Sequence, residues 1–477
     1  MSDRSSVVEH AELSRSFGPV SLTLFGVGTV VGAGIFVLTG QAAALYAGPA
    51  VTISFLVSGL VCAFAALCYA ELAAMAPVAG AAYSFTRYAF GVLPGWIVGW
   101  ALVAEMLFAA SAVAIGWSAY VQVALAPFGL AVPAALASSP IAMDGHAFHL
   151  TGSLINLPAA LLVAFMTALL YRGTQESARF NAFIVSVKLS AVMLFLVLGL
   201  AYSNSRNWLP FVPDEVIAPD GSHAYGMAGV LKAAGIVFFA FLGFDAVATA
   251  AQETRWPERN VPIGILASLG ISTALYIGVS LAMTGMVDFH QLNTAAPLTA
   301  ALAEAGPALA WLKTYVGIAA SIGLGSAVLV ASFALSRLLF SLARDGLLPA
   351  RLASVHAATG VPRTAVLAGG ITAIAMAAVF PINLLGELVS TGTLMAFATV
   401  CAAAFALRLR EPDRHRPFRV PFWPLTTLLG VLSCLFLLAS MGGAALLRIL
   451  TWQLVGALVL LLSRRAAGRG AGGAMGR

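Results

Sequence analysis

The stretch GTVVGAGIFVLTGQ, residues 28–41, lies inside the first long apolar run of the chain. Glycine weakens a helix, yet this run carries Gly28, Gly32 and Gly34. One explanation is close helix packing, because small residues four apart let two helices approach, and Gly28 and Gly32 fit that spacing. The other is an interrupted helix, which a membrane tolerates only where the irregular backbone lines a cavity. The stretch alone leaves both open.

The composition indicates a membrane protein. Of the 477 residues, 60% are hydrophobic and only 9% are charged, whereas a soluble chain carries about 25% charged residues. We expect no removable signal peptide, because the first 20 residues are polar and of mixed charge. The cysteines Cys62, Cys68, Cys401 and Cys434 fall in apolar runs without zinc-type spacing, and we expect small buried side chains there.

Twelve apolar runs are long enough to cross a bilayer, which takes about 20 residues per helix. Their expected positions are 22–46, 50–76, 91–124, 153–171, 181–202, 228–251, 262–286, 308–342, 364–381, 384–407, 424–446 and 449–463. With the N-terminus in the cytoplasm, the outer loops hold only Arg206, Lys313 and Arg448, while Lys188 and Lys232 belong to spans. The other 20 of the 25 basic residues then lie inside. This bias predicts an inner (plasma) membrane protein with both termini cytoplasmic, and it explains the net charge without nucleic acid.

A second interruption is predicted in the sixth span. In FFAFLGFDAVATAAQE, residues 238–253, Gly243 breaks an aromatic run and Asp245 places a carboxylate within the span. Interrupted spans at matching positions in two halves indicate a transporter binding site, and spans one and six are five apart. We therefore expect an all-α bundle with spans 1–5 and 6–10 as inverted repeats and two peripheral helices. The domain boundaries are a tail at 1–21, repeats at 22–202 and 203–407, helices 11–12 at 408–463 and a tail at 464–477.

Six ordered motifs carry a resemblance that covers nearly the whole chain. They are GVGTVVGAGIFVLTGQAA, CYAELAAMAPVAGAAYSFTRYAFG, YRGTQESARFNAFIVSVKLSAV, FFAFLGFDAVATAAQETRWPERNVP, ARDGLLP and PFRVPFWP. With them the sequence resembles the amino acid–polyamine–organocation superfamily, and within it bacterial members of the cationic amino acid transporter family. The resemblance implies alternating access and an L-amino acid held where helices one and six unwind.

Carried onto this chain, the resemblance implies a set of binding residues. Backbone N–H groups at residues 32–35 would bind the substrate carboxylate, as free N–H groups at a helix end can. Carbonyls near Val30 and in the sixth span would take the ammonium group, and Phe239 would close over the substrate. The implied set is Val30, Gly32, Ala33, Gly34, Ile35, Phe239, Ala240 and Leu242.

Lys188 is the most informative of the charges that fall inside spans. A charge at the bilayer centre costs about 2.5–3.5 kcal/mol on insertion scales, which makes it a functional candidate. Its stem could instead carry the ammonium group to the interface. The family resemblance implies that a lysine on helix five replaces a sodium ion, contacting carbonyls near Gly28 and polar groups of helix eight such as Ser332. This favours proton coupling without sodium.

Three carboxylates have alternatives that the sequence leaves open. Asp245 could hold the unwound segment through backbone N–H groups, lie near the substrate ammonium, or relay a proton. Glu105, in the middle of the third span, could pair with a cation or carry a proton. Glu71, near the inner end of the second span, is expected to cap a helix or pair with an inner arginine. The charges of RLLFSLARDGLLP and RLREPDRHRPFRVP are expected to be solvated or lipid-facing.

The sequence predicts a transporter. Six of the seven histidines fall in predicted loops and His10 lies in the tail, so no catalytic or metal-binding set is expected, and no GxxxxGK[ST] motif indicates ATP. We expect no cofactor, and an accessory membrane subunit is left open. The predicted function is a proton-coupled permease for L-amino acids, including small neutral ones such as alanine, because Ala109, Ala110 and Gly323 suggest an apolar pocket. Alternatives are an arginine and lysine transporter, an exchanger, and a channel or amino acid sensor.

Overall fold

The fold is an assembly of long apolar helices. A computed structural model describes residues 18–32, 34–75, 81–130, 132–144, 147–173, 178–217, 223–249, 254–356 and 360–474. In the described residues, eight helices are long and apolar enough to cross a membrane, and four shorter apolar helices accompany them. The count of twelve spans, the domain boundaries and the inverted repeat stay predictions.

The first half of the chain contains the following elements. They are α1 (Pro19–Val30), a π-helix (Gly34–Leu38), α2 (Thr39–Ala42), a π-helix (Ala43–Ala47), a 3₁₀ turn (Gly48–Ala50), α3 (Val51–Met75), α4 (Ala81–Phe90), α5 (Val92–Leu125), a 3₁₀ turn (Ala126–Phe128), α6 (Ala134–Ala137), β1 (Ile141–Asp144), β2 (Ala147–Leu150), α7 (Leu157–Arg172), α8 (Ala178–Ala201) and a 3₁₀ turn (Ser205–Trp208).

The second half begins with a short hairpin and continues with helices. Its elements are β3 (Val216–Ile217), β4 (His223–Ala224), α9 (Gly226–Val237), a 3₁₀ helix (Phe238–Phe241), α10 (Ala246–Thr249), α11 (Pro257–Met286), a 3₁₀ turn (Phe289–Leu292), α12 (Pro297–Glu304), a 3₁₀ turn (Pro307–Leu309), α13 (Ala310–Arg344), a 3₁₀ turn (Ala350–Ala353), α14 (Arg363–Val379), α15 (Ile382–Arg410), α16 (Trp423–Ser440) and α17 (Gly443–Ala474).

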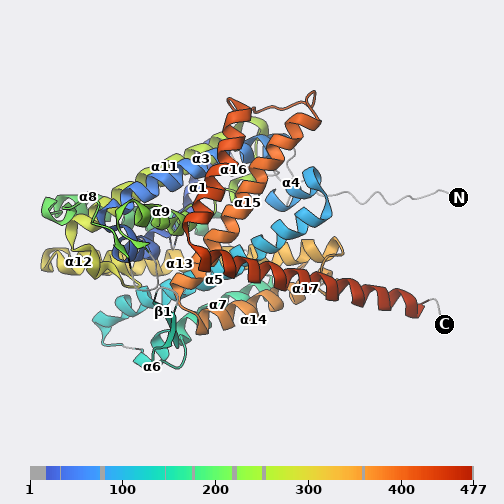
Figure 1. Ribbon diagram of the computed structural model, residues 1–477. Coiled ribbons are helices and arrows are strands. Elements are labelled where there is room, and N and C mark those ends of the chain that lie inside the picture. Colours follow the sequence, from blue (N-terminus) through green and yellow to red (C-terminus); the bar gives the residue numbers. More distant parts are fainter. Residues whose placement is uncertain are drawn as a thin grey trace.

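The core lies where the long helices pack side by side (Figure 1). α13 packs along α5, α11 along α3, α15 along α5 and α16, and α1 along α11. Apolar side chains from all these helices form one continuous buried cluster. Short α4 and the end of α17 lie toward the same end of the molecule, on the right in Figure 1. We call this end, which also carries Arg87, Arg344 and Arg408, the basic end.

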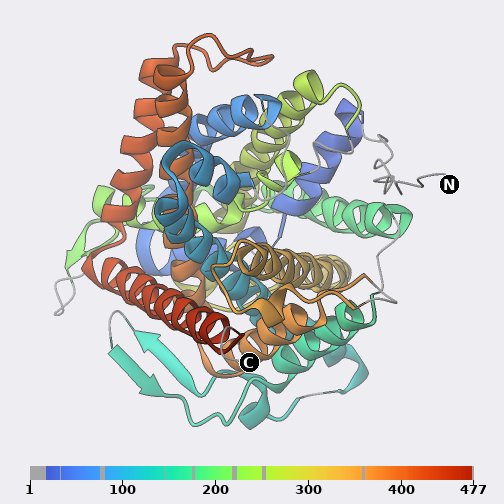
Figure 2. The same ribbon diagram turned by 90° about the vertical axis from the view of Figure 1, so that its right-hand side faces the viewer.

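The all-α prediction missed two small hairpins. β1 pairs with β2 and β3 with β4, both antiparallel. The β1–β2 hairpin lies at the edge of the molecule, outside the helices (Figure 2). Both hairpins belong to connections between long helices, where apolar periodicity gives no signal.

Candidate functional site

The two predicted interruptions meet in the middle of the helical assembly. α1 ends at Val30, and helical structure resumes at Gly34 as a π-helix. The second interruption follows the 3₁₀ helix Phe238–Phe241 and ends where α10 begins at Ala246. A Cβ on Gly34 would overlap the Cα of Ala240, so the two backbones touch there. Glycine is needed for this close approach.

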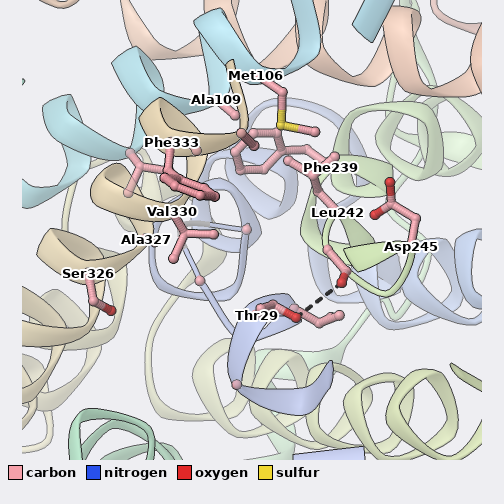
Figure 3. Close-up of a pocket in the computed structure, with 18 of the residues that line it drawn as sticks. Thr29, Met106, Ala109, Phe239, Leu242, Asp245, Ser326, Ala327, Val330 and Phe333 are labelled. Atoms are coloured by element: carbon pink, nitrogen blue, oxygen red, sulfur yellow. Dashed lines mark hydrogen bonds between the residues drawn. The ribbon is translucent and has the colours of Figure 1, made fainter. Parts of the chain in front are cut away.

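Gly243 and Thr29 make a second contact between the interruptions. Gly243 has φ +109°, a conformation that favours glycine, and a Cβ there would lie 3.1 Å from the carbonyl carbon of Thr29. The Thr29 hydroxyl lies 3.0 Å from the Gly243 carbonyl (Figure 3) and 2.8 Å from the Gly26 carbonyl of its own helix, so its one proton can serve one of them at a time. The two interruptions therefore contact each other at two places, Gly34 with Ala240 and Thr29 with Gly243.

Tyr276 of α11 is a residue that sequence reasoning missed. Its hydroxyl lies 2.7 Å from the Val30 carbonyl and 2.6 Å from the Ala240 carbonyl, one from each interruption. The side chain is fully buried, and its single hydroxyl proton can serve one carbonyl at a time. A lone tyrosine in an apolar span was a usable signal, because a buried hydroxyl needs a partner.

A cavity of about 510 Å³ adjoins the interruptions. Its surface is mostly apolar, and Met106, Phe239, Val330 and Phe333 gather around it with Asp245 to one side (Figure 3). The lining residues are Phe25, Gly28, Thr29, Val30, Gly32, Gly34, Ala82, Leu102, Met106, Ala109, Val113, Lys188, Phe239, Leu242, Gly243, Asp245, Ser326, Ala327, Val330, Ala331, Phe333, Ala334, Arg337, Leu338 and Ser341.

The structure brings most of the predicted binding residues to this cavity. The ones that line it are Val30, Gly32, Gly34, Phe239 and Leu242. Ile35 and Ala240 are buried but do not line it, and Ala33 lies outside the described residues. Of the small residues expected in the pocket, Ala109 lines it, whereas Ala110 and Gly323 do not.

Lys188 reaches the first interruption from α8. Its ammonium group donates a hydrogen bond to the Gly28 carbonyl, and the side chain is buried. The stem passes Gly323 of α13, where a Cβ would lie 3.1 Å from the lysine Cδ. The side chain therefore points into the bundle and does not reach for an interface. No carboxylate in the described ranges forms an ion pair with it.

The predicted contact between Lys188 and Ser332 is wrong. Ser332 is buried, and its hydroxyl has no hydrogen-bond partner among the described residues. Two other serines of α13, Ser326 and Ser341, line the cavity to which Lys188 also belongs. The sequence could not decide between them, because α13 is apolar nearly all round and its rotation is not readable from periodicity.

The two intramembrane carboxylates occupy different places. Asp245 lines the cavity and is 8% exposed. Glu105 is fully buried on α5 and does not line the cavity, and neither of its carboxylate oxygens has a hydrogen-bond partner among the described residues.

Glu71 organises a buried ion cluster at the basic end. It accepts hydrogen bonds from Arg408 at the end of α15, with 2.7 Å to Nε, and from the Val420 N–H at 2.7 Å. Arg416 Nε lies 3.2 Å from Oε1 of Glu71, the oxygen that also accepts from Arg408 Nε. Pairing with an inner arginine was one of the two expected roles of Glu71. The charges of RLREPDRHRPFRVP were expected to be solvated or lipid-facing. Arg410, Asp413, His415 and Arg419 are exposed, whereas Arg416 is only 6% exposed.

The ARDGLLP segment is also paired at the same end. Asp345 forms an ion pair with Arg87 of α4 and accepts a hydrogen bond from the Tyr83 hydroxyl. Burial, followed by the hydrogen bond to Asp345, raises the pKa of Tyr83 to about 12. Arg344 and Asp345 are nevertheless exposed, so this pairing is compatible with the solvated or lipid-facing charges that the sequence suggested.

A model of the amino acid permease family matches residues 17–461. The chain belongs to this family. Among similar proteins, the methylthioribose transporter of Bacillus subtilis (strain 168) is 41% identical over 95% of this chain and 94% of its own. The branched-chain amino acid permease BcaP of the same organism is 40% identical over the same shares. Cationic amino acid transporter 9, chloroplastic, of Arabidopsis thaliana is 36% identical over 91% of this chain and 73% of its own.

The family assignment agrees with the resemblance found in the six motifs. As an amino acid permease of the amino acid–polyamine–organocation superfamily, this chain is a multi-pass membrane transporter and not an enzyme. The cavity between the interrupted helices is its candidate substrate site.

Proposed function

We propose that this permease carries neutral L-amino acids with apolar side chains, from alanine to the branched-chain residues, by proton-coupled, sodium-independent alternating access. The observation that carries the proposal is the cavity itself: backbone of both interruptions on one wall, and apolar side chains such as Met106, Val330 and Phe333 on the others. Backbone N–H groups at a helix start favour a carboxylate, and apolar walls favour an apolar side chain. A relative named as a branched-chain amino acid permease supports this range.

In the proposed coupling mechanism, the ammonium group of Lys188 takes the place of a coupling ion. Its ammonium group contacts the Gly28 carbonyl next to the first interruption, so a fixed cation already occupies that position. A sodium ion there would be repelled by the charge. Loss and gain of a proton at Lys188 would then accompany movement of α1, while Glu105 and Asp245 remain further candidate proton sites. We place both termini in the cytoplasm of a plasma-membrane protein, with the basic end inside.

Two other substrates deserve a test in the same experiment. Methylthioribose is the substrate named for one relative, and it has neither a carboxylate nor an ammonium group. Arginine and lysine are suggested by the cationic transporter relatives and by Asp245 in the cavity wall. The two cations Lys188 and Arg337 in that wall oppose a cationic side chain.

The test is uptake into liposomes that contain the purified protein. Labelled alanine, leucine, arginine and methylthioribose are each offered with an inside-alkaline pH gradient and no sodium, then with sodium and no pH gradient. Accumulation of alanine and leucine by the pH gradient alone is expected. Sodium-driven accumulation would overturn the built-in cation, and uptake of methylthioribose or arginine alone would overturn the substrate range. A carrier shows saturable uptake, and unlabelled substrate inside the liposomes accelerates the uptake of labelled substrate by exchange. A channel or a sensor would not show this behaviour.

A further inference from the structure

One face of α13 borders the cavity over a long distance. Its cavity-lining residues run from Ser326 to Ser341, fifteen residues apart, which at a rise of 1.5 Å per residue is about 22 Å. The Ser326 end of this face lies beside Lys188, whose stem packs on Gly323. Ala82 of α4 also joins the lining. The cavity therefore continues from the interrupted helices toward the basic end.

Arg337 is the one cation on this face among the described lining residues. It follows Val330 by seven residues, which places it about 10 Å further toward the C-terminus of α13. Its guanidinium carbon lies 4.8 Å from the centre of the ring of Phe333, which precedes it by one helical turn. In the ranges that the structure describes, no carboxylate forms an ion pair with it. Its charge thus faces the route between the substrate site and the basic end.

The chemistry of this position selects a carboxylate. A guanidinium group presents a planar fork of donors that matches a carboxylate with two parallel hydrogen bonds. Stacking on Phe333 holds the group in place while leaving donors free. The other walls at this level are apolar or small, including Ala334 and Leu338, so a zwitterion passing here meets one dominant polar partner.

We propose that Arg337 is a second binding station for the substrate carboxylate, between the interrupted helices and the basic end. An amino acid that leaves the N–H groups near Gly32 and Gly34 pairs its carboxylate with Arg337 before it exits. The station rests on the proposed function, since it requires a substrate that carries a carboxylate. It also makes this end of the route unfavourable for cationic side chains, because the guanidinium repels them.

The test measures each side of the protein separately. Right-side-out and inside-out membrane vesicles are used to obtain the half-saturating concentration of labelled L-alanine at each face. Arg337→Gln is expected to raise this value about tenfold at the basic end, equivalent to about 1.4 kcal/mol, and to leave the opposite face unchanged. Arg337→Lys keeps the charge but not the planar fork of donors. Its half-saturating concentration at the basic end is expected to lie between those of the wild type and Arg337→Gln. Arg344→Gln is the matched control, since Arg344 lies on the same helix but does not line the cavity.

A second readout uses alaninamide, which lacks the carboxylate. At the basic end, the wild-type protein should prefer alanine over alaninamide as competitor. Arg337→Gln should lose part of that preference at this end, and the N–H groups near Gly32 and Gly34 should keep the rest. An equal change at both faces, or none at either, would overturn the station. If Arg337→Gln does not fold, Arg337→Lys decides, because unchanged values in that variant at both faces also contradict recognition by the fork. Wild-type vesicles that carry no amino acid would instead overturn the proposed function.

Discussion

The ammonium group of Lys188 donates a hydrogen bond to the main-chain carbonyl of Gly28, two residues before α1 ends at Val30. This contact links α8 to the first broken helix inside the bundle. The carbonyl and the ammonium group are both removed from water, so each depends on the other. Any motion that separates α1 from α8 must break this bond.

Lys188→Ala is expected to abolish accumulation driven by a pH gradient. Leaving the Gly28 carbonyl without its buried donor costs about 1–3 kcal/mol, and the fixed charge is lost as well. Uptake of labelled alanine into liposomes should fall by about tenfold or more, with residual flux that no longer responds to pH. Lys232→Ala is the control, since that lysine lies over the Tyr46 ring, away from the cavity. Full pH-driven accumulation by Lys188→Ala would refute the coupling role.

Gly34→Ala tests the contact between the two interruptions. The added Cβ would overlap the Cα of Ala240, a backbone atom that cannot rotate away. We expect a destabilisation of about 1–3 kcal/mol or misfolding, measured as a lower melting temperature in detergent, together with loss of uptake. In Gly32→Ala, two residues earlier, the nearest atom to the added Cβ outside the adjacent residues is the Val30 carbonyl oxygen at 3.9 Å. This control should keep its melting temperature, and equal losses in both variants would contradict the crossing.

Tyr276→Phe removes the hydroxyl shared by the Val30 and Ala240 carbonyls. Because both carbonyls belong to interrupted helices, we expect a loss of stability of about 1–3 kcal/mol, seen in thermal denaturation in detergent. Substrate should protect the variant less than it protects the wild type, since the two carbonyls are no longer held. Tyr315→Phe loses a hydroxyl that bonds the exposed Ser190 at 2.6 Å, and it should cost much less. An unchanged melting temperature in Tyr276→Phe would mean that the Tyr276 hydroxyl does not stabilise the two interruptions.

Glu71→Gln removes the charge that holds two arginines and the Val420 N–H. Breaking a buried ion pair by removing one partner costs about 3–5 kcal/mol. We expect a marked fall in melting temperature and faster trypsin cleavage after Arg419. Glu411→Gln disrupts the exposed pair with Arg414 and should cost at most about 1 kcal/mol. Unchanged cleavage in Glu71→Gln would show that the cluster does not anchor the connection between α15 and α16.

The sequence predicted the position of the site better than its internal contacts. Apolar runs place spans well, as with 50–76 for α3 at Val51–Met75, because hydropathy depends only on composition. The predicted span 424–446 extends past the end of α16 at Ser440. The chain leaves the helix near Gly442, which has φ +93°, but the residues around it are equally apolar and give no sign of this end. Gly34 and Gly243 signalled the interruptions because glycine is costly in a helix.

The remaining contacts depend on helix rotation and on long-range folding. Nothing in an apolar helix such as α13 states that Ser326 faces the cavity and Ser332 does not. The ion pair of Glu71 with Arg416 joins residues 345 positions apart, and a count of loop charges cannot reveal that one of them is buried. The role of Tyr276 could be predicted only with the knowledge that α11 packs against both interruptions.

The glycine at position 34 also has a genetic consequence. Every amino acid other than glycine carries a Cβ, so each missense change of this codon introduces the atom that Ala240 excludes. A saturation library at position 34 should therefore return only synonymous codons under selection for transport. In contrast, alanine at position 32 should still give a folded protein, although it lies in the same seven-residue stretch VVGAGIF.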